Sequence, residues 1–167
     1  MISPRKKQVA RNGLCSARVA YLGWHVTAAS GPHYPQSMAK PVPIGRRGAV
    51  ERRVEFQDTL AAWRPELPPV LSTPHMIGWM EGAGFEALLP FCEGDEVSVG
   101  TAININHLAP AGIGALVRCE AVLESINGRF LILRVTAQSG DRMIGEGTIG
   151  RAIVSKSKFE GKFRAGT

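Results

Sequence analysis

Cysteine is scarce in this chain of 167 residues, which contains only Cys15, Cys92 and Cys119. Their wide spacing fits neither a zinc site nor a disulfide framework, so we expect reduced thiols and a cytoplasmic location. Long apolar runs are lacking as well, and none approaches the roughly 20 residues that a membrane-spanning helix needs. The composition therefore argues against disulfide-stabilised and membrane-spanning proteins, and we expect no membrane partner.

Motifs that would indicate a cofactor or a familiar catalytic mechanism are also missing. The sequence contains no G-x-x-x-x-G-K-[ST] phosphate loop, no Rossmann glycine fingerprint, no G-x-S-x-G elbow and no H-E-x-x-H metal motif. Nucleotide hydrolysis and metal-dependent catalysis therefore have no support. We expect neither a metal nor another cofactor.

Acidic residues are absent from residues 1–47, which carry eight of the 20 basic residues of the chain. The other residues contain 12 basic against 14 acidic residues, so the net charge of +6 originates in this leader. A nucleic-acid function inferred from overall charge would rest on the leader alone, and we expect no nucleic-acid partner.

The leader has little helical or strand periodicity, and we expect it to be poorly ordered. Met38 begins a stretch that looks like an ordinary N-terminus, so we interpret residues 1–37 as an upstream extension without a chemical role. An arginine-rich, acid-free segment is also typical of an organelle transit peptide, and this alternative stays open.

The body of the chain, residues 48–159, contains one long helical segment and several alternating segments. We expect a helix at Thr73–Leu89 and a helical turn at Thr59–Trp63, and Asn127-Gly128 is a strong hairpin signal. The segments that alternate as strands do are Gly48–Phe56, Glu96–His107, Gly114–Ile126, Arg129–Gln138 and Arg142–Val154. This order predicts an α+β fold in which a curled antiparallel sheet of about five strands wraps around one long helix. The polar end, residues 160–167, is expected to fray.

The long helical segment is unusually rich in glycine around Glu81. Gly78, Gly82 and Gly84 each cost about 1 kcal/mol relative to alanine in a helix. Something must therefore approach this helix closely, whether a sheet, a second subunit or a ligand. In such surroundings Glu81 could act as a general base or as a nucleophile, although a lone helical glutamate is usually a solvated residue.

Three further positions could take part in chemistry with Glu81. Thr73 lies at the start of the helix, His107 ends the following strand, and Gly100 exposes a backbone N–H that could donate to a carbonyl oxygen. Each has an ordinary structural explanation as a helix cap, a hydrogen-bonded histidine or a β-bulge. Their combination in one helix and its following strand is more informative than any one of them.

Three stretches carry a resemblance to a known family: VLSTPHMIGWMEGAG, EVSVGTAININHLAPAGIGA and MIGEGTIGRAIV. They resemble the hotdog-fold thioesterases related to fluoroacetyl-CoA thioesterase, over roughly residues 48–159. The resemblance implies a hotdog fold and hydrolysis of a small or medium acyl-CoA to the free acid and CoA. It also implies a homodimer that holds the thioester between subunits, with higher assembly left open.

The resemblance further implies roles for individual residues. Thr73, Glu81 and His107 match the catalytic set of the family, and Gly100 and Arg151 match residues that contact the substrate. In these roles the Gly100 N–H polarises the thioester carbonyl, Glu81 is base or nucleophile, His107 handles a proton and Thr73 orients the group.

One departure from the family limits what the resemblance implies. Fluoroacetyl-CoA thioesterase has a phenylalanine lid shortly before the catalytic threonine, whereas this chain has Leu67, Pro68, Pro69 and Val70. The departure argues against specificity for fluoroacetyl-CoA and leaves the general chemistry in place. Two other functions stay open on the same fold: a non-catalytic acyl-CoA-binding or sensor protein, and a hydratase or dehydratase.

Overall fold

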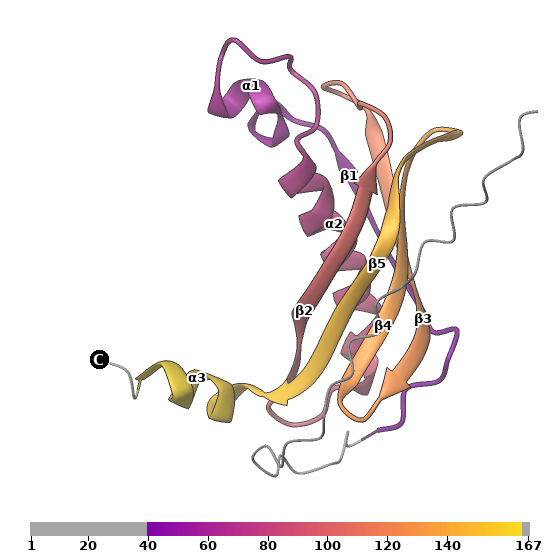
Figure 1. Cartoon of the computed structure of the whole chain (residues 1–167), viewed down its shortest axis with the longest axis vertical. Coiled ribbons are helices and arrows are strands. Elements are labelled where there is room, and N and C mark those ends of the chain that lie inside the picture. Colours follow the sequence, from indigo (N-terminus) through magenta and orange to yellow (C-terminus); the bar gives the residue numbers. More distant parts are fainter. Residues whose placement is uncertain (1–39, 165–167) are drawn as a thin grey trace, which may run out of the picture. The chain divides into compact units, whose positions relative to one another are not determined.

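The computed structural model describes residues 40–164, which form one antiparallel sheet with a long helix along one face (Figure 1). Its strands are β1 (Arg47–Arg53), β2 (Glu96–His107), β3 (Leu116–Asn127), β4 (Phe130–Ser139) and β5 (Arg142–Ser155). Its helices are α1 (Leu60–Trp63), α2 (Thr73–Leu88) and α3 (Lys156–Arg164), with short 3₁₀ turns η1 (Phe56–Asp58) and η2 (Leu89–Phe91). The expected α+β architecture, five antiparallel strands around one long helix, is confirmed.

The strand order in the sheet is β1-β3-β4-β5-β2, so β1 and β2 form its two edges. The predicted hairpin is present: β3 pairs with β4 as far as Asn127 and Phe130, and Gly128 has a φ of +59° in the turn. The β2 strand pairs with β5 over its whole length, with one register shift between Gly100 and Ala102. This shift is the β-bulge that was one explanation for Gly100.

Helix α2 begins where the sequence predicts and ends one residue earlier than expected. Ser72 is extended and its carbonyl accepts the first helical hydrogen bond, from the Met76 N–H, and Pro74 occupies the first turn. The Ser72 hydroxyl bonds the His75 ring at 2.8 Å instead of capping the backbone. Pro90 shifts the chain into the 3₁₀ turn η2 after Leu88, because proline cannot donate the hydrogen bond that would continue the helix.

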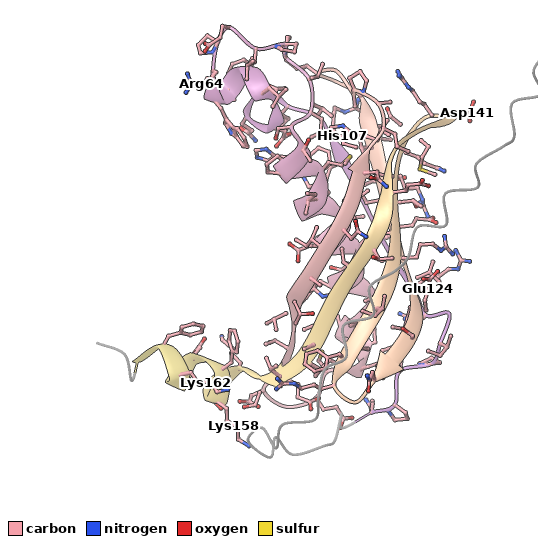
Figure 2. All side chains as sticks on the ribbon, viewed as in Figure 1. Arg64, His107, Glu124, Asp141, Lys158 and Lys162 are labelled. Atoms are coloured by element: carbon pink, nitrogen blue, oxygen red, sulfur yellow. The ribbon has the colours of Figure 1, made fainter. Side chains whose placement is uncertain are left out.

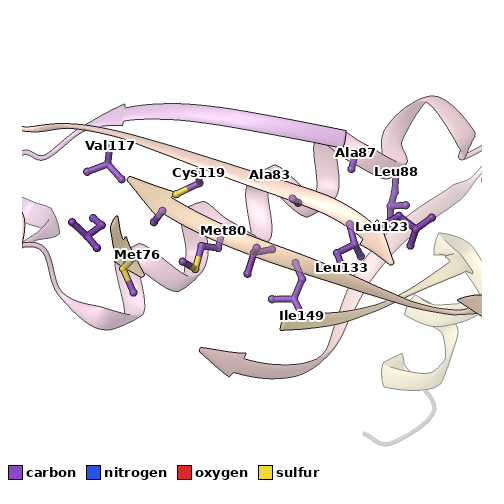
Figure 3. Close-up of a cluster of buried hydrophobic side chains, with 14 of the residues drawn as sticks. Met76, Met80, Ala83, Ala87, Leu88, Val117, Cys119, Leu123, Leu133 and Ile149 are labelled. Carbon is purple, nitrogen blue, oxygen red and sulfur yellow. The ribbon is translucent and has the colours of Figure 1, made fainter. Parts of the chain in front are cut away.

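The core lies between α2 and the facing side of the sheet (Figure 3). On the helix, the fully buried apolar residues are Met76, Met80, Ala83, Ala87 and Leu88. Alternate residues of β3 and β4 face them, as predicted for β3, and these are Val117, Cys119, Ala121, Leu123, Leu131, Leu133, Val135 and Ala137. Burying each large side chain contributes about 1.5–3 kcal/mol, so this contact fixes the helix on the sheet.

The close approach predicted from the glycine-rich helix occurs at one of its three glycines. A Cβ on Gly84 would lie 2.6 Å from Ile149 Cδ1, so a larger residue at this position would require the Ile149 side chain to shift. Gly82 has only ordinary contacts with Val50, and no described atom lies within 4 Å of a Cβ on Gly78. A second close approach involves a glycine of the sheet: Gly48 on β1 lies against the helix backbone at Ala83 and Ala87.

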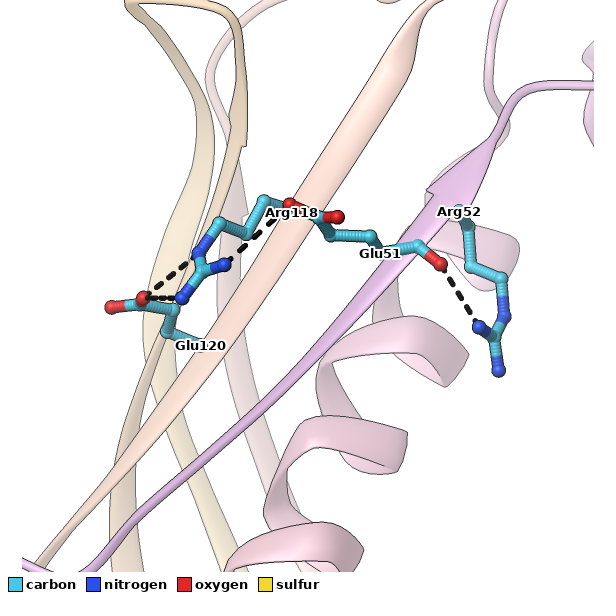
Figure 4. Close-up of polar contacts among 4 residues, drawn as sticks. All are labelled: Glu51, Arg52, Arg118 and Glu120. Carbon is cyan, nitrogen blue, oxygen red and sulfur yellow. Dashed lines mark hydrogen bonds and ion pairs between the residues drawn. The ribbon is translucent and has the colours of Figure 1, made fainter.

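Charged side chains cover the outer face where β1 meets β3 (Figure 4). Arg118 donates to Glu120 at 2.7 Å and to Glu51 at 3.5 Å, and Glu51 is its partner across the two strands. Arg52, the next residue of β1, pairs with the buried Val117 and so lies on the other face at the sheet edge, where it is exposed and donates to the Glu51 carbonyl at 2.9 Å. Exposed ion pairs of this kind contribute little to stability. We assign this face no chemical role.

Residues 40–47 contact the sheet: Val42 is buried and the Gly45 N–H donates to the Leu123 carbonyl at 2.8 Å. The poor order expected of the leader stays a prediction. The rest of the leader, including the proposed extension 1–37 and Met38, lies outside the described residues. The C-terminal end forms α3 through Arg164, where fraying was expected. No helix within residues 40–164 is long and apolar enough to cross a membrane.

Candidate active site

The side chains of Thr73 and His107 meet where α2 begins and β2 ends. Thr73 Oγ1 lies 2.9 Å from His107 Nδ1, and His107 Nε2 lies 3.1 Å from the carbonyl oxygen of Ala109. A carbonyl oxygen can only accept, so Nε2 carries the proton of that bond. In the neutral ring Nδ1 is then the acceptor, and the Thr73 hydroxyl donates to it. Two hydrogen bonds therefore fix both the tautomer and the orientation of the imidazole.

An open pocket of about 270 Å³ adjoins this pair. Its lining is aliphatic except for the pair itself and consists of Leu60, Val70, Leu71, Thr73, His107, Leu108, Ala109 and Pro110. Figure 2 shows His107 at this end of the sheet, near the loop that leads into α2. An apolar cavity with two polar groups at one wall can take an apolar substituent and present its polar end to a hydroxyl and an imidazole.

A second group of predicted residues gathers two turns further along α2. The Glu81 carboxylate lies against Gly100, so closely that a Cβ on Gly100 would overlap its oxygen. Only glycine leaves room for the carboxylate there, which is a firmer reason for Gly100 than the bulge alone. The Glu81 side chain remains 34% exposed, so water can reach it.

Arg151 on β5 links Glu81 to Ser98 of β2 through hydrogen bonds. It is 5% exposed, and its guanidinium donates to the hydroxyl and carbonyl of Ser98 at 2.7 and 2.8 Å and to the Glu81 carbonyl at 3.3 Å. Its Nη1 also lies 3.6 Å from the Glu81 carboxylate. Burial lowers the pKa of Arg151, and the carboxylate of Glu81 opposes that shift. This position supports a role in orienting Glu81; the substrate contact implied by the resemblance stays a prediction.

Replacing Arg151 by lysine is expected to lower kcat on the order of 10- to 100-fold, because a small displacement of a catalytic group has effects of this size. Lysine keeps the positive charge. It lacks the planar guanidinium group that donates to both oxygens of Ser98 and to the Glu81 carbonyl at the same time. The measurement is kcat together with thermal unfolding, which separates misplacement from instability. Arg134→Lys, an exposed arginine paired with Glu124, is the matched control. An unchanged kcat in Arg151→Lys would refute the orienting role.

The bulge in β2 gives both groups of residues the same orientation. Ser98 and Gly100 are paired with Ile153 and Arg151 on β5, and His107 is paired with Gly145. Antiparallel partners share a face, and these β5 residues are buried on the helix side. Without the extra residue, Gly100 and His107 would point to opposite faces because they are an odd number of positions apart.

Within one chain the two groups nevertheless remain apart. Thr73 and Glu81 are eight residues apart on α2, or about 12 Å at 1.5 Å per residue. Gly100 and His107 are seven residues apart on β2, or about 23 Å at 3.3 Å per residue. The structure therefore brings Thr73 to His107 and Glu81 to Gly100 and Arg151, and it does not join the two groups in a single chain.

Sequence reasoning missed Ser98 and the residues that line the pocket. A signal for Ser98 was present: Arg151 follows Ile149 by two positions and precedes Ile153 by two, so it lies among buried residues and needs a polar partner. The pocket had no such signal, because Leu60 belongs to a single helical turn and Leu108 to a loop, and the two meet only in the folded chain.

Comparison with known proteins identifies relatives of this chain. The model of a family described as fluoroacetyl-CoA-specific thioesterase matches residues 54–157. The fluoroacetyl-CoA thioesterase of Streptantibioticus cattleyicolor is 42% identical over 102 residues, which cover 61% of this chain and 73% of that protein. A solved structure of the fluoroacetyl-CoA thioesterase FlK superposes with a TM-score of 0.72 at 36% identity, over 77% of this chain and 99% of the other.

Two further solved structures extend the comparison. A Thermus thermophilus hypothetical protein, described as a thioesterase superfamily member, has a TM-score of 0.71 at 33% identity, over 75% of this chain and 93% of the other. A hot-dog-like protein from Thermanaerovibrio acidaminovorans has a TM-score of 0.68 at 24% identity, over 74% and 91%, and indicates the fold alone. The match over residues 54–157 confirms the resemblance: the chain belongs to the fluoroacetyl-CoA-specific thioesterase family, whose named members are thioester hydrolases, and it has their hotdog fold.

Proposed function

We propose that this chain hydrolyses a small or medium acyl-CoA thioester to the free acid and CoA, as a homodimer with two active sites. The observation that carries this proposal is the position of the two groups of site residues. Both lie along β2, one near its middle and one at its end, on the same face of an edge strand. Each group is incomplete alone, and a second copy can supply what each lacks.

The free edge of β2 supports pairing with a second copy. In the described chain β2 pairs only with β5, and residues 100–104 are all exposed, including Ile103 at 50%. A long edge strand with unpaired backbone groups is a template for another strand. In the proposed dimer the two β2 strands pair antiparallel, so that the two sheets become continuous.

The register of this pairing decides which residues meet. With a twofold axis at Ile103 and the bulge counted as one position, Gly100 of one chain lies opposite the partner's Ile105, on the same face as the partner's His107 and two residues from it. Gly100 and the partner's His107 then lie on adjacent strands about 4.8 Å apart. Glu81 and Arg151 accompany Gly100, and the partner's Thr73 accompanies its His107. Symmetry repeats the arrangement at the other end of the interface, which gives two equivalent sites.

The proposed chemistry follows from these positions. The carbonyl carbon of the thioester is attacked either by water, with Glu81 taking its proton, or by the Glu81 carboxylate itself to give an anhydride that water then opens. In both routes the bond from carbon to sulfur breaks, the acid leaves with one oxygen from water, and the thiolate receives a proton. That proton originates in the attacking water; His107, held by Thr73, is proposed to take it up and pass it to the thiolate. The Gly100 N–H is proposed to polarise the carbonyl oxygen.

The aliphatic pocket beside His107 is proposed to hold the acyl group. Its volume of about 270 Å³ exceeds the need of a two-carbon acyl group, and its walls offer only apolar side chains apart from the catalytic pair. Leu67, 38% exposed, stands in the segment where the resemblance led us to expect a phenylalanine lid. We therefore favour short to medium unsubstituted acyl groups and do not assign fluoroacetyl-CoA as the substrate.

The cytoplasmic location stays part of the proposal and rests on the cysteines. Cys92 and Cys119 are free, and burial raises the pKa of Cys119 to about 12 and, together with the carboxylate of Glu96, raises that of Cys92. Thiols with raised pKa values are poorly reactive and serve as small core residues.

The test is a thiol-release assay with the full chain and a panel of acetyl-, butyryl-, hexanoyl-, benzoyl- and fluoroacetyl-CoA, with crotonyl-CoA added as an enoyl-CoA. We expect release of CoA from one or more of the short and medium substrates. Tight binding without release from any member of the panel would favour the sensor function. Loss of enoyl-CoA absorbance without thiol release would favour the hydratase.

A further inference from the structure

Helix α3 presents an aromatic pair that is partly exposed. Phe159 and Phe163 lie one turn apart with their rings edge to face, 5.1 Å between centroids. They are 37% and 67% exposed. Figure 1 shows α3 extending away from the sheet, beyond the β2 edge. Two large exposed aromatic side chains on a short projecting helix are typical of a surface that packs on another molecule.

The base of α3 is held firmly beside the start of β2. The Lys156 N–H donates to the Asp95 carbonyl at 2.8 Å, and the Ser157 N–H and hydroxyl donate to the Asp95 carboxylate at 3.1 and 2.6 Å. Hydrogen bonds from Ser157, and then from Ser155, lower the pKa of Asp95. These hydrogen bonds anchor the first residues of α3 to Asp95, next to the start of β2, and give the helix a defined direction.

A complementary surface lies on the segment that leads to the pocket. Residues 55–67 expose Phe56 at 59%, Trp63 at 55% and Leu67 at 38%, and the same segment contributes Leu60 to the pocket wall. Its charge is also complementary: residues 55–66 hold three acidic residues and one arginine, whereas residues 156–163 hold three lysines and one glutamate.

We infer that α3 of one copy packs across the dimer on residues 55–67 of the partner and closes the partner's acyl pocket. This inference rests on the proposed function and its dimer. With the twofold axis at Ile103 and the bulge counted as one position, Glu96 faces the partner's Ala109, a pocket residue. Ser155 pairs with Glu96, so α3 starts at that level. Nine residues of helix span about 13 Å, enough to cross from the β2 edge to the partner's pocket.

The arrangement gives the pocket an aromatic cover in trans. Residues 67–70 provide no aromatic side chain to cover the acyl group. In the proposed arrangement Phe159 and Phe163 of the partner provide this cover. A cover of this kind excludes water from the acyl chain and contributes binding energy that grows with apolar contact. Substitution in α3 should therefore raise KM for acyl-CoA more than it lowers kcat.

The test uses a heterodimer of one Glu81→Gln chain and one His107→Ala chain, purified through two different affinity tags. In the proposed dimer it keeps one complete site, made of Glu81 from the His107→Ala chain and His107 from the Glu81→Gln chain. The cover of that site comes from α3 of the His107→Ala chain. Phe159→Ala/Phe163→Ala on this chain is expected to lower kcat/KM for hexanoyl-CoA on the order of tenfold. The same pair on the Glu81→Gln chain is expected to leave it unchanged.

Phe130→Ala, an exposed aromatic on β4, is the matched control on either chain. Phe163→Ala alone, at the most exposed of the two positions, serves if the double variant folds poorly. Equal effects on both chains, or none on either, would overturn the placement of α3 while the activity of the unmodified heterodimer still supports the proposed site. An inactive unmodified heterodimer beside active wild-type protein would overturn the composite site, and the placement of α3 with it.

Discussion

Glu81→Gln is expected to lower kcat by about 10²- to 10⁴-fold on every acyl-CoA that the wild-type chain hydrolyses, the range that a positioned acid or base contributes. Glutamine has nearly the same shape, so it can keep the contact with Gly100 and the packing beside Arg151. It removes the negative charge that water activation or nucleophilic attack requires. Because only the chemical step is affected, KM should change little.

The control for this variant is Glu86→Gln, an exposed glutamate five residues further along α2. It should retain full turnover, and both variants should unfold at the temperature of the wild-type chain. Rates are measured by thiol release at saturating substrate, with circular dichroism to verify the fold. Normal rates for Glu81→Gln on all substrates would remove Glu81 from the mechanism, whichever of its two roles was assumed.

Gly100→Ala is expected to lower turnover on the order of 10²-fold or more, comparable with loss of an oxyanion donor. The added methyl group would occupy the space of the Glu81 carboxylate, which must then turn away. Gly100 is exposed and alanine suits a strand better than glycine, so the free energy of unfolding should not fall. Loss of activity with retained stability is the signature of a displaced catalytic group.

Gly112→Ala is the matched control, because its φ is not positive and no described atom lies within 4 Å of a Cβ there. Thermal unfolding and kcat are measured for both variants, to determine whether activity falls while stability is retained. If Gly100→Ala keeps the wild-type kcat, then Glu81 either moves without penalty or has no part in catalysis.

Local signals predicted the elements of this fold well. Proline in the first turn of α2, the hairpin at Asn127-Gly128 and the alternation of β3 and β4 each act over a few residues. The buried side of α2 was harder to predict. Met76 is fully buried and Ile77 only partly, and which of these neighbours faces the core depends on the direction from which the sheet contacts the helix.

The sequence named candidate site residues one by one and did not predict their arrangement. Neither the hydrogen bond from Thr73 to His107 nor the contact of Glu81 with Gly100 follows from spacing alone. Both depend on the bulge in β2, whose extra residue has no sequence signature beyond the glycine itself. The order of α3 was missed for a similar reason, since the hydrogen bonds to Asp95 come from a residue some 60 positions away.

The central claim is that one active site takes Glu81 from one chain and His107 from its partner. The most direct measurement is the activity of the purified heterodimer of Glu81→Gln and His107→Ala chains, compared with each variant homodimer. Each homodimer lacks one required group in both sites and should be nearly inactive.

The account predicts that the heterodimer recovers about half of the wild-type activity, because one of its two symmetric sites has both groups intact. If each site instead took both residues from a single chain, every site of the heterodimer would carry one defect. A heterodimer no more active than the two homodimers would therefore contradict the account.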